Sequence, residues 1–525
     1  MAVALATSAC TAGSGATTSI VPEPGSDETT STVAPTTVTS STLADTTSTT
    51  AGPPTLPGAT KAFQPAPCDA ILDPLAPPVP NAVCGFVSVP LDHADPAVGA
   101  VRIAVSYFAN FTEGPPMMAF LGGPGIGNAG LLGAFAGAPF PILMMDERGT
   151  GSSEPSLDCP EVEADFERRL TEPFFHQPAL ERYRVALQQC RDRLADAGID
   201  LGMFGSDQSA RDIGIVHRAL GFQEVTLLGA SYGSRLILTK LREEPDGVRG
   251  VILESPVPVE WNMFEARPMV ESDALQHLFS ACRDDQICHG AHGDLMSVIA
   301  DTMTRLDAEP VTVTVSRAVG DEELPMLFDG DAFLIDIMSA MGDTFMIPRL
   351  PQLITRVSEG DIEALVTLGD SMMEMIDPIF PFSEGMQTSV ICYEEDPFND
   401  PSAIEAAVDD AIDLLDLRFY EEAVDDCAIW DIEAAGPIEN QPVQSDVPAL
   451  VIAGAFDPIT PVSNAEMIAA ALPNATVVVH PAGGHGAGPS SPCTLGLVDS
   501  FFEDPNATLD TSCVDGMTGP RFAGR

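Results

Sequence analysis

The residue types that could do chemistry are clearest in the stretch Gly229-Ala230-Ser231-Tyr232-Gly233. Apolar residues typical of a buried strand precede it, and a helical pattern follows it. A G-x-S-x-G in this context is typical of a nucleophile elbow, in which small residues permit a sharp turn that lifts the serine oxygen at a helix N-terminus. A plain tight turn is the alternative. We interpret Ser231 as a nucleophile.

A serine hydroxyl needs a base and an orienting carboxylate before it can attack a carbonyl. Both residue types follow in the expected order, because Asp457 comes just after an apolar run and His485 lies in a later glycine-rich loop. His480 is the rival base, but it ends a predicted strand, whereas the glycines around His485 give its imidazole an easier approach to Ser231. An aspartate before a proline is otherwise often a turn residue. We predict a triad of Ser231, His485 and Asp457.

Acyl transfer also needs hydrogen-bond donors for the developing oxyanion. The backbone N–H of Tyr232 follows the nucleophile directly, and the glycine turn 122–125 follows the apolar run 117–121. We expect the amides of Tyr232 and Gly123 to form the oxyanion hole, with a neighbouring residue of the turn as the alternative to Gly123. The glycine turn could instead serve only the packing of a strand against a helix. This chemistry requires no metal or organic cofactor.

The elements that must position these groups alternate between short apolar strands and helices. This pattern is typical of an α/β protein with a mostly parallel sheet covered on both faces. Near residue 261 it gives way to a Met-rich, acidic and mainly helical region that continues to about 440. Strands are predicted over 98–108, 117–121, 141–145, 224–230, 248–253, 447–453 and 475–480, and helices over 210–220 and 234–243, among others.

The chain therefore divides into five predicted segments. The uncharged run 114–145 is not a membrane span, because its eight Gly and five Pro would break a helix in lipid. The segments are a signal remnant over 1–10, a Ser/Thr-rich disordered stalk over 11–61, the first part of the α/β core over 62–260, a helical cap over 261–440, and the C-terminal part of the core over 441–525.

Cysteine usage bears on the compartment. Apart from Cys10, ten cysteines are spread through the chain, an even number that indicates disulfides formed in an oxidising compartment. Ten buried thiols are the alternative. Neighbours along the chain are the expected partners, which gives the pairs Cys68 with Cys84, Cys159 with Cys190, Cys282 with Cys288, Cys392 with Cys427, and Cys493 with Cys513.

The N-terminus is typical of targeting and tethering. Thr7-Ser8-Ala9-Cys10 resembles the lipobox of bacterial lipoproteins, in which the cysteine becomes the acylated first residue. Residues 11–60 contain 23 Ser or Thr and no Lys or Arg, so they cannot bury enough apolar surface to fold. We expect an extracellular or cell-surface protein that contacts a bacterial membrane only through a lipid on Cys10, with simple secretion as the alternative.

The charge balance limits the partners. The chain has 24 Lys plus Arg against 77 Asp plus Glu, a formal net charge of -53. Affinity for phosphate backbones comes mainly from clustered basic residues, so nucleic acid is excluded as a partner. With 45% hydrophobic residues, the chain can bury a large core.

Five motifs stand out together: Gly122-Gly123-Pro124-Gly125, Asp146-Glu147-Arg148-Gly149-Thr150-Gly151-Ser152-Ser153, the elbow 229–233, Asp457-Pro458-Ile459-Thr460-Pro461 and Gly484-His485-Gly486. In combination, these motifs resemble the proline iminopeptidase and tripeptidyl aminopeptidase family of α/β-hydrolases. The resemblance covers roughly residues 68–515. It implies a secreted or cell-surface serine exopeptidase, with a cap over the site, that acts on peptides with a free N-terminus.

An aminopeptidase must hold the ammonium group of its substrate, and related enzymes use acidic residues for this purpose. Cys392-Tyr393-Glu394-Glu395 resembles the Cys-x-acid segment of the family. Glu394 is therefore the candidate for amine binding, and Glu395 is its rival. With 77 acidic residues in the chain, a solvated surface carboxylate is the alternative for either one.

Two other functions use the same features. A carboxylesterase or another small-molecule hydrolase could use the same triad, because fold and triad do not choose between ester and amide. The second alternative function is that of a non-catalytic binding protein on a hydrolase scaffold. The complete set of Ser, His and Asp argues against this alternative. The number of residues released per cut, a preference for proline and the oligomeric state are left open.

Overall fold

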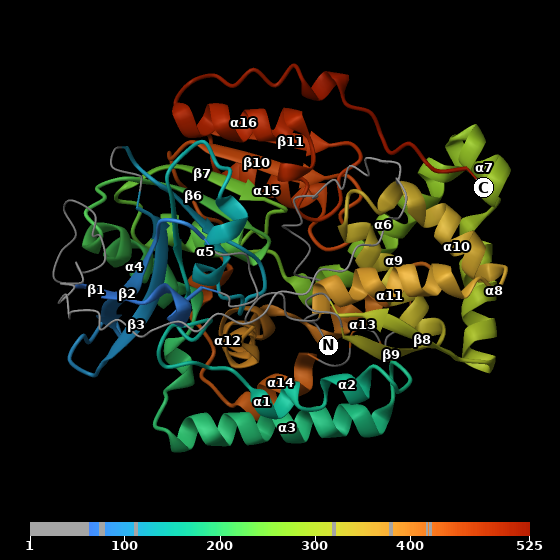
Figure 1. The fold of residues 1–525 in the computed structure, drawn as a ribbon, viewed down its shortest axis with the longest axis horizontal. Helices are drawn as coiled ribbons and strands as arrows, with labels where there is room; N and C mark the ends of the chain where they lie inside the picture. The colour runs from blue at the N-terminus through green and yellow to red at the C-terminus, as the bar shows by residue number, and fades with distance from the viewer. Residues whose placement is uncertain are drawn as a thin grey trace, which may run out of the picture.

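The computed structural model describes residues 62–72, 79–109, 114–317, 322–376, 382–415, 418, 420 and 423–524. Within these residues, nine strands form one sheet in the order β1-β2-β3-β5-β4-β6-β7-β10-β11 (Figure 1). The strands are β1 (Phe63–Ala66), β2 (Ala82–Pro90), β3 (Ala100–Phe108), β4 (Met117–Phe120), β5 (Ile142–Met145), β6 (Val225–Ala230), β7 (Val248–Glu254), β10 (Ala449–Gly454) and β11 (Ala475–His480).

Most of this sheet is parallel. All neighbouring pairs from β5 through β4, β6, β7 and β10 to β11 run parallel, whereas β1, β2 and β3 pair antiparallel at one side. The predicted mostly parallel α/β sheet is therefore confirmed, and the seven predicted strands are found within two residues at each end. β1 and β2 were not among the predicted strands.

Alternate residues of the strands pack on opposite faces of the sheet. On β7, Val251 and Leu253 belong to one hydrophobic cluster, and Ile252 between them belongs to another. The first cluster includes residues of the helices α4 (Ser206–Ala219) and α5 (Tyr232–Glu243), and the second includes residues of α16 (Pro492–Glu503). Helices therefore cover both faces, as a parallel sheet of apolar strands requires.

The segment between β7 and β10 forms the cap. Most of its buried side chains form a hydrophobic cluster of their own, and the helices of this cluster lie beside the core in Figure 1. The predicted helical insertion is observed, with the addition of an antiparallel hairpin of β8 (Val311–Ser316) and β9 (Glu323–Phe328). Its helices are α6 (Met263–Asp284), α7 (Gln286–His292), α8 (Leu295–Ala308), α9 (Gly330–Gly342), α10 (Leu350–Ser358), α11 (Ile362–Ile376), α12 (Glu384–Val390), α13 (Pro401–Asp410) and α14 (Ala423–Trp430).

The C-terminal segment joins the core to the cap. After α16 it crosses the molecule and ends beside α7 (Figure 1). The amide of Ala523 donates to the carbonyl of Pro348 at 2.9 Å, and the Ala523 carbonyl lies 3.0 Å from Nε2 of His292. Phe522 is buried in the cap cluster. The last described residues therefore stabilise the position of the cap on the core.

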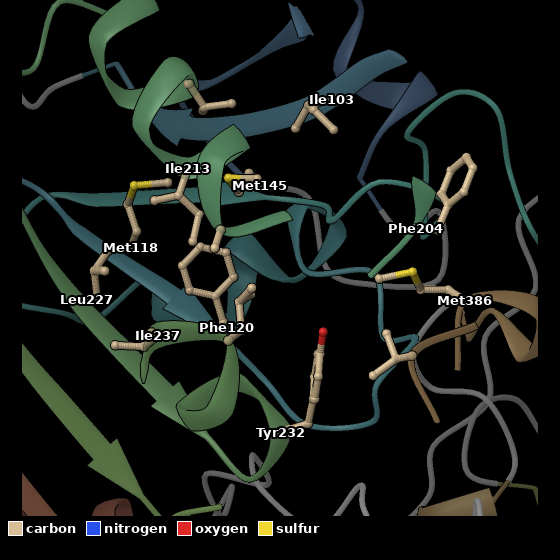
Figure 2. Close-up of a cluster of buried hydrophobic side chains, with 14 of the residues drawn as sticks. Ile103, Met118, Phe120, Met145, Phe204, Ile213, Leu227, Tyr232, Ile237 and Met386 are labelled. Atoms are coloured by element: carbon tan, nitrogen blue, oxygen red, sulfur yellow. The ribbon is translucent and has the colours of Figure 1, made fainter. Parts of the chain in front are cut away.

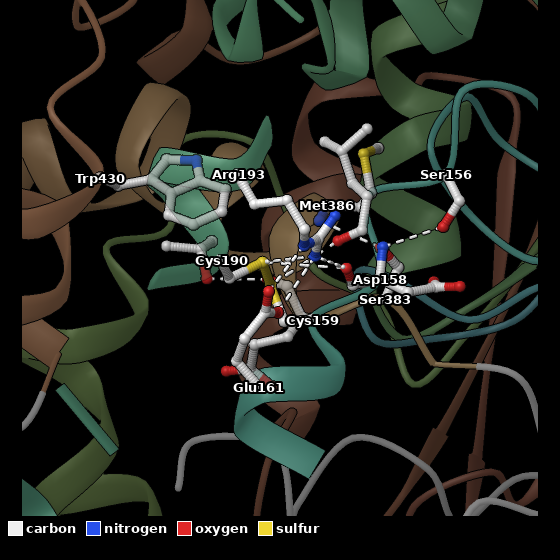
Figure 3. Close-up of a disulfide and its surroundings, with 12 residues drawn as sticks. Ser156, Asp158, Cys159, Glu161, Cys190, Arg193, Ser383, Met386 and Trp430 are labelled. Atoms are coloured by element: carbon white, nitrogen blue, oxygen red, sulfur yellow. Dashed lines mark hydrogen bonds and ion pairs between the residues drawn. A yellow bond between two sulfur atoms is a disulfide. The ribbon is translucent and has the colours of Figure 1, made fainter. Parts of the chain in front are cut away.

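The ten cysteines predicted to be paired form the five expected disulfides, and connectivity follows the order along the chain. Figure 3 shows the pair Cys159 and Cys190, which joins the start of α1 (Pro160–Glu163) to α3 (Gln177–Asp196). Arg193, one turn after Cys190, bonds Glu161 at 2.6 Å and the carbonyl of Asp158 at 2.7 Å. The disulfide and this ion pair hold the same two segments together.

The predicted signal remnant over 1–10, with the lipobox cysteine Cys10, and the predicted stalk over 11–61 lie outside the described residues. Across the described part of the chain, no helix combines the length and the apolar character needed to cross a membrane.

Candidate active site

Ser231 occupies the sharp turn that its motif predicts. It lies between the end of β6 and the start of α5 with φ 54° and ψ -126°, a backbone conformation that residues with a side chain seldom adopt. Two glycines make this turn possible. A Cβ at Gly229 would meet the carbonyl of Gly233, and a Cβ at Gly233 would meet the carbonyl of Phe120 on β4. The strained turn is a structural property of a nucleophile elbow.

The sheet order brings the other two candidate residues to the same edge. Ser231 follows β6, Asp457 follows β10, and His485 follows β11, with β7 between β6 and β10. Because these strands are parallel, their C-terminal ends share one edge of the sheet. Three residues that are far apart in the sequence are therefore brought to one region by the fold.

Asp457 and His485 are in direct contact. Nδ1 of His485 lies 2.9 Å from Oδ2 of Asp457, and both side chains are fully buried. Asp457 also accepts hydrogen bonds from the amides of Ile459 at 2.8 Å and Thr460 at 2.9 Å, and from the Thr460 hydroxyl at 2.6 Å. Burial opposes the ionisation of Asp457, but the charge of His485 and the hydrogen bonds from His485 and Thr460 together hold its pKa below the usual value.

The second ring nitrogen of His485 is free to act as a base. Nδ1–H donates to Asp457, so Nε2 of the neutral ring is the acceptor, and Nε2 is buried with no hydrogen-bond partner. Ser231 has 5% of its surface exposed. Catalytic hydrogen bonds between serine and histidine are often long before a substrate binds.

The rival base His480 has a different environment. It ends β11, and its Nδ1 accepts a hydrogen bond from the amide of Ala482 at 3.2 Å within its own loop. Burial lowers the pKa of His480 below the usual value. The described contacts of Asp457 are with His485 and not with His480, so the geometry favours His485.

The expected oxyanion donors flank the elbow. Tyr232 is the first residue of α5, so its N–H has no acceptor within the helix. The close approach of Gly233 to the carbonyls of Phe120 and Leu121 places the elbow against the end of β4, where the glycine turn begins. Gly123 has φ +110°, a conformation that favours glycine. The assignment of the two amides as donors stays a prediction.

The side chain of Tyr232 enters a buried polar network that the sequence analysis missed. Its hydroxyl lies 2.8 Å from Oγ of Ser206 and donates to Oε2 of Glu147 at 3.3 Å. Figure 2 shows the Tyr232 ring among buried side chains, with Met386 of the cap helix α12 nearby. Burial raises the pKa of Glu147 to about 8, an effect that the hydrogen bond from Tyr232 opposes and the charge of Glu394 strengthens.

Glu394 contacts Ser206, and both Glu394 and Glu395 contact Arg235 of the helix that follows the elbow. Glu394 Oε1 accepts hydrogen bonds from the Ser206 hydroxyl at 2.5 Å and amide at 3.1 Å, whereas its Oε2 is buried with no hydrogen-bond partner. Glu395 Oε1 pairs with Nη1 of Arg235 at 2.8 Å. Both side chains are buried, so neither is a solvated surface carboxylate.

Arg235 connects this acidic pair to the nucleophile helix. It lies on the first turn of α5, and its Nη2 donates to the backbone carbonyl of Glu394 at 3.0 Å. Its Nε is 4.0 Å from Oε2 of Glu394. Burial raises the pKa of Glu394 to about 7, although Arg235 acts in the opposite direction.

The cap contacts the loops that carry the candidate residues. The amide of Gly484 donates to the hydroxyl of Thr344 at 3.0 Å, and the amide of Ser383 donates to the carbonyl of Gly125 at 2.9 Å. Thr344 follows α9 and Ser383 precedes α12, both in the cap. The site therefore lies where cap and core meet, next to the base loop and the glycine turn.

Comparisons with known proteins agree with this architecture. Residues 115–275 match the family described as alpha/beta hydrolase fold, and residues 416–513 match the family described as TAP-like protein. The serine protease Hip1 of Mycobacterium tuberculosis is 24% identical over 417 residues, which cover 73% of this chain and 77% of that protein. A tripeptidyl aminopeptidase of Streptomyces lividans is 24% identical over 302 residues, 54% of each chain.

Among solved structures, a thermophilic esterase from Thermogutta terrifontis covers 80% of this chain and 99% of its own, at 15% identity and a TM-score of 0.37. The sheet order and the elbow define an α/β-hydrolase. The sequence matches confirm the resemblance to α/β-hydrolase peptidases, among them the serine protease Hip1 and the tripeptidyl aminopeptidase.

Proposed function

We propose that this protein is a serine exopeptidase that releases single residues or short peptides from free N-termini. The contact of His485 with Asp457, with Nε2 of His485 buried and without a hydrogen-bond partner at the sheet edge where Ser231 lies, carries the proposal. The peptidases among the relatives support peptide substrates. The five disulfides support an oxidising compartment, so we place the enzyme outside the cell or on its surface, with Cys10 as the site of lipid attachment.

The mechanism follows from the roles of three side chains. Nε2 of His485 takes the hydroxyl proton of Ser231 as Oγ forms a bond to the scissile carbonyl carbon. The carbonyl oxygen becomes an oxyanion, which the amides of Tyr232 and Gly123 stabilise. Asp457 holds the imidazole in the Nδ1–H tautomer and stabilises its charged form.

Collapse of this intermediate breaks the carbon–nitrogen bond. His485 gives its proton to the leaving amine, and the acyl group stays on Ser231 as an ester. Water then gives a proton to His485 and attacks the ester carbonyl, and the proton passes to Oγ when the acid product leaves. Both half-reactions return the site to its starting protonation state.

Glu394 is the proposed site for the substrate ammonium. Its Oε2 has no hydrogen-bond partner, whereas Oε1 of Glu395 is already paired with Arg235. An ammonium group at Oε2 would supply the hydrogen-bond donor that this oxygen lacks, and its charge would add to that of the Arg235 guanidinium 4.0 Å away. This difference in free acceptor capacity favours Glu394 over Glu395.

Paired peptide substrates test this function. We would measure fluorophore release from peptides of one to three residues, each with a free and with an acetylated N-terminus, by the wild type and by Ser231→Ala. The proposal expects cleavage of the free-amine peptides alone and no turnover by the variant. The length that is cut fastest would identify the number of residues released.

The same assay separates the alternatives. Glu394→Gln should raise KM for free-amine peptides, and Glu161→Gln on the surface is the matched control that should leave KM unchanged. Cleavage of a short acyl ester but of neither peptide would keep the triad and refute the peptidase. Equal cleavage of free and acetylated peptides would refute the exopeptidase.

A further inference from the structure

The end of β7 holds a buried carboxylate that the proposed mechanism does not use. Glu254 is the last residue of this strand, with only 7% of its surface exposed. β7 lies between β6, which leads to Ser231, and β10, which leads to Asp457. Glu254 is thus at the edge of the sheet where the candidate triad assembles, on the strand between nucleophile and acid.

Glu254 contacts the elbow and the base loop at the same time. Its backbone carbonyl accepts a hydrogen bond from the amide of Ser231 at 2.9 Å. Its carboxylate Oε1 accepts a short hydrogen bond from the amide of Gly488, three residues after His485. One residue therefore links the turn of the nucleophile to the loop that carries the base.

Ser255, the next residue, adds a second contact to the base loop. Its hydroxyl accepts a hydrogen bond from the amide of Gly486 at 2.8 Å, and its own amide donates to Ile452 of β10 at 2.8 Å. Its φ of 44° is rare for a residue with a side chain. Glu254 and Ser255 thus accept hydrogen bonds from the amides of Gly488 and Gly486, which are the third and first residues after His485.

The loop is shaped to accept the Glu254 side chain. A Cβ at Gly488 would lie 2.6 Å from Oε1 and 2.7 Å from Cδ of Glu254. Contacts this short do not occur between real side chains, so an alanine there would have to displace the carboxylate. A glycine at this position is what allows the hydrogen bond to form.

The charge of Glu254 acts on the base. Burial raises the pKa of Glu254 to about 7, which the Gly488 amide and His485 oppose and Asp457 strengthens. Among the described residues, His485 and Asp457 are the titratable groups that act on it. Above this pH the carboxylate is ionised, and a negative charge near an imidazole favours the protonated ring.

We infer that Glu254 is a positioning residue for His485, which fixes the base loop through Gly488 and adds a second negative charge beside the base. The inference rests on the proposed function, because it requires His485 to be the general base. Glu254 acts through His485 and takes no proton from the substrate. Asp457 orients the ring, and Glu254 orients the loop and supports the charge that the ring acquires.

Glu254→Gln separates charge from hydrogen bonding. The amide oxygen of Gln can still accept from Gly488, but the negative charge is gone. The wild type carries this charge only above about pH 7, so the upper part of the acid limb of kcat/KM should move to lower pH in the variant, and the plateau of kcat should fall about tenfold. KM should stay unchanged, because the variant affects the charged transition state.

Two further variants complete the test. Gly488→Ala keeps Glu254 but disturbs its contact, and should lower kcat at every pH if the link to the loop matters. Asp336→Asn is the matched control, because burial also raises the pKa of Asp336 well above the usual value, but Asp336 lies on α9 of the cap. Its acid limb should coincide with that of the wild type. Thermal melting checks that each variant is folded.

Each outcome decides the inference. The inference would be supported if the acid limb of the kcat/KM profile shifts in Glu254→Gln and does not shift in Asp336→Asn. Wild-type kcat in Gly488→Ala, or coincident profiles of Glu254→Gln and wild type while Ser231→Ala is inactive, would overturn it and leave the proposed function in place. Activity in Ser231→Ala would instead show that the proposed function itself is wrong.

Discussion

The imidazole of His277 on cap helix α6 lies against the ring of Phe456, with 4.3 Å between the ring centroids. Phe456 immediately precedes Asp457, and its buried ring belongs to the hydrophobic cluster of the cap. The acid loop of the core is therefore anchored in the cap. The backbone amide of Phe456 also donates a hydrogen bond to the carbonyl of Gly483 in the base loop at 2.8 Å. The position of the cap and the geometry of the candidate triad are thus coupled through one residue.

Phe456→Ala should lower both stability and activity. Truncation of a buried phenylalanine costs about 3 to 5 kcal/mol in the free energy of unfolding. Phe328→Ala is the matched control, because Phe328 is also fully buried in the cap cluster but lies on the hairpin strand β9. Urea unfolding should give similar losses for both, while kcat should fall more in Phe456→Ala. Equal kcat in the two variants would contradict the coupling.

Thr460→Val should reduce kcat and leave KM nearly unchanged. The Thr460 hydroxyl donates to Oδ2 of Asp457 at 2.6 Å and lies 3.2 Å from Nδ1 of His485. A hydrogen bond to a charged group contributes about 1.5 to 3 kcal/mol, so the rate should fall by about ten- to a hundredfold. Thr460→Ser, which keeps the hydroxyl, should restore most of the rate. Steady-state kinetics of both variants would show whether the hydroxyl or the methyl group matters.

The buried acid Glu147 predicts how stability changes with pH. Burial raises its pKa from 4.5 to about 8, so the folded protein binds this proton more tightly than the unfolded chain does. The resulting stabilisation is complete below pH 4.5 and is lost as the pH rises toward 8. Glu147→Gln, which cannot ionise, should therefore lose less stability between these pH values. Melting temperatures at pH 5 and 8.5 would test this, and parallel curves for the two proteins would refute it.

The disulfide Cys392–Cys427 holds the segment that contains Glu394. The two cysteines of this disulfide are 35 residues apart in the sequence, whereas those of Cys282–Cys288 in the same cap are 6 residues apart. From loop entropy, removal should cost about 4 kcal/mol for the first pair and about 2 kcal/mol for the second. The Cys392→Ser, Cys427→Ser double variant should also raise KM for free-amine peptides, because Glu394 would be held less firmly. Unchanged KM would argue against Glu394 as the amine site.

The local features of the site could be predicted from the sequence, and its non-local support could not. The elbow around Ser231 is encoded by adjacent residues, and Asp457 and His485 follow strands whose apolar patterns are clear. Glu147 and Thr460 lie inside motifs that were recognised, but their contacts depend on which strands become neighbours. Their roles emerge only after folding.

Glu254 shows which signal was available and missed. It ends the apolar run Val251-Ile252-Leu253, where a charged residue is unusual and where a parallel sheet presents its functional edge. The strands β1 and β2 were missed because their residues pair antiparallel at the sheet margin, outside the repeated strand and helix pattern. The position of the cap could not be predicted either, since contacts such as that of His277 with Phe456 join residues 179 positions apart in the chain.

Labelling with a fluorophosphonate tests the central claim most directly, because this reagent bonds to an activated serine and mass spectrometry locates the adduct. We predict a single adduct on Ser231, with no labelling of Ser231→Ala, a much slower reaction in His485→Gln and a wild-type rate in His480→Gln. An adduct on another serine, no adduct at all, or labelling that depends on His480 and not on His485 would contradict the account.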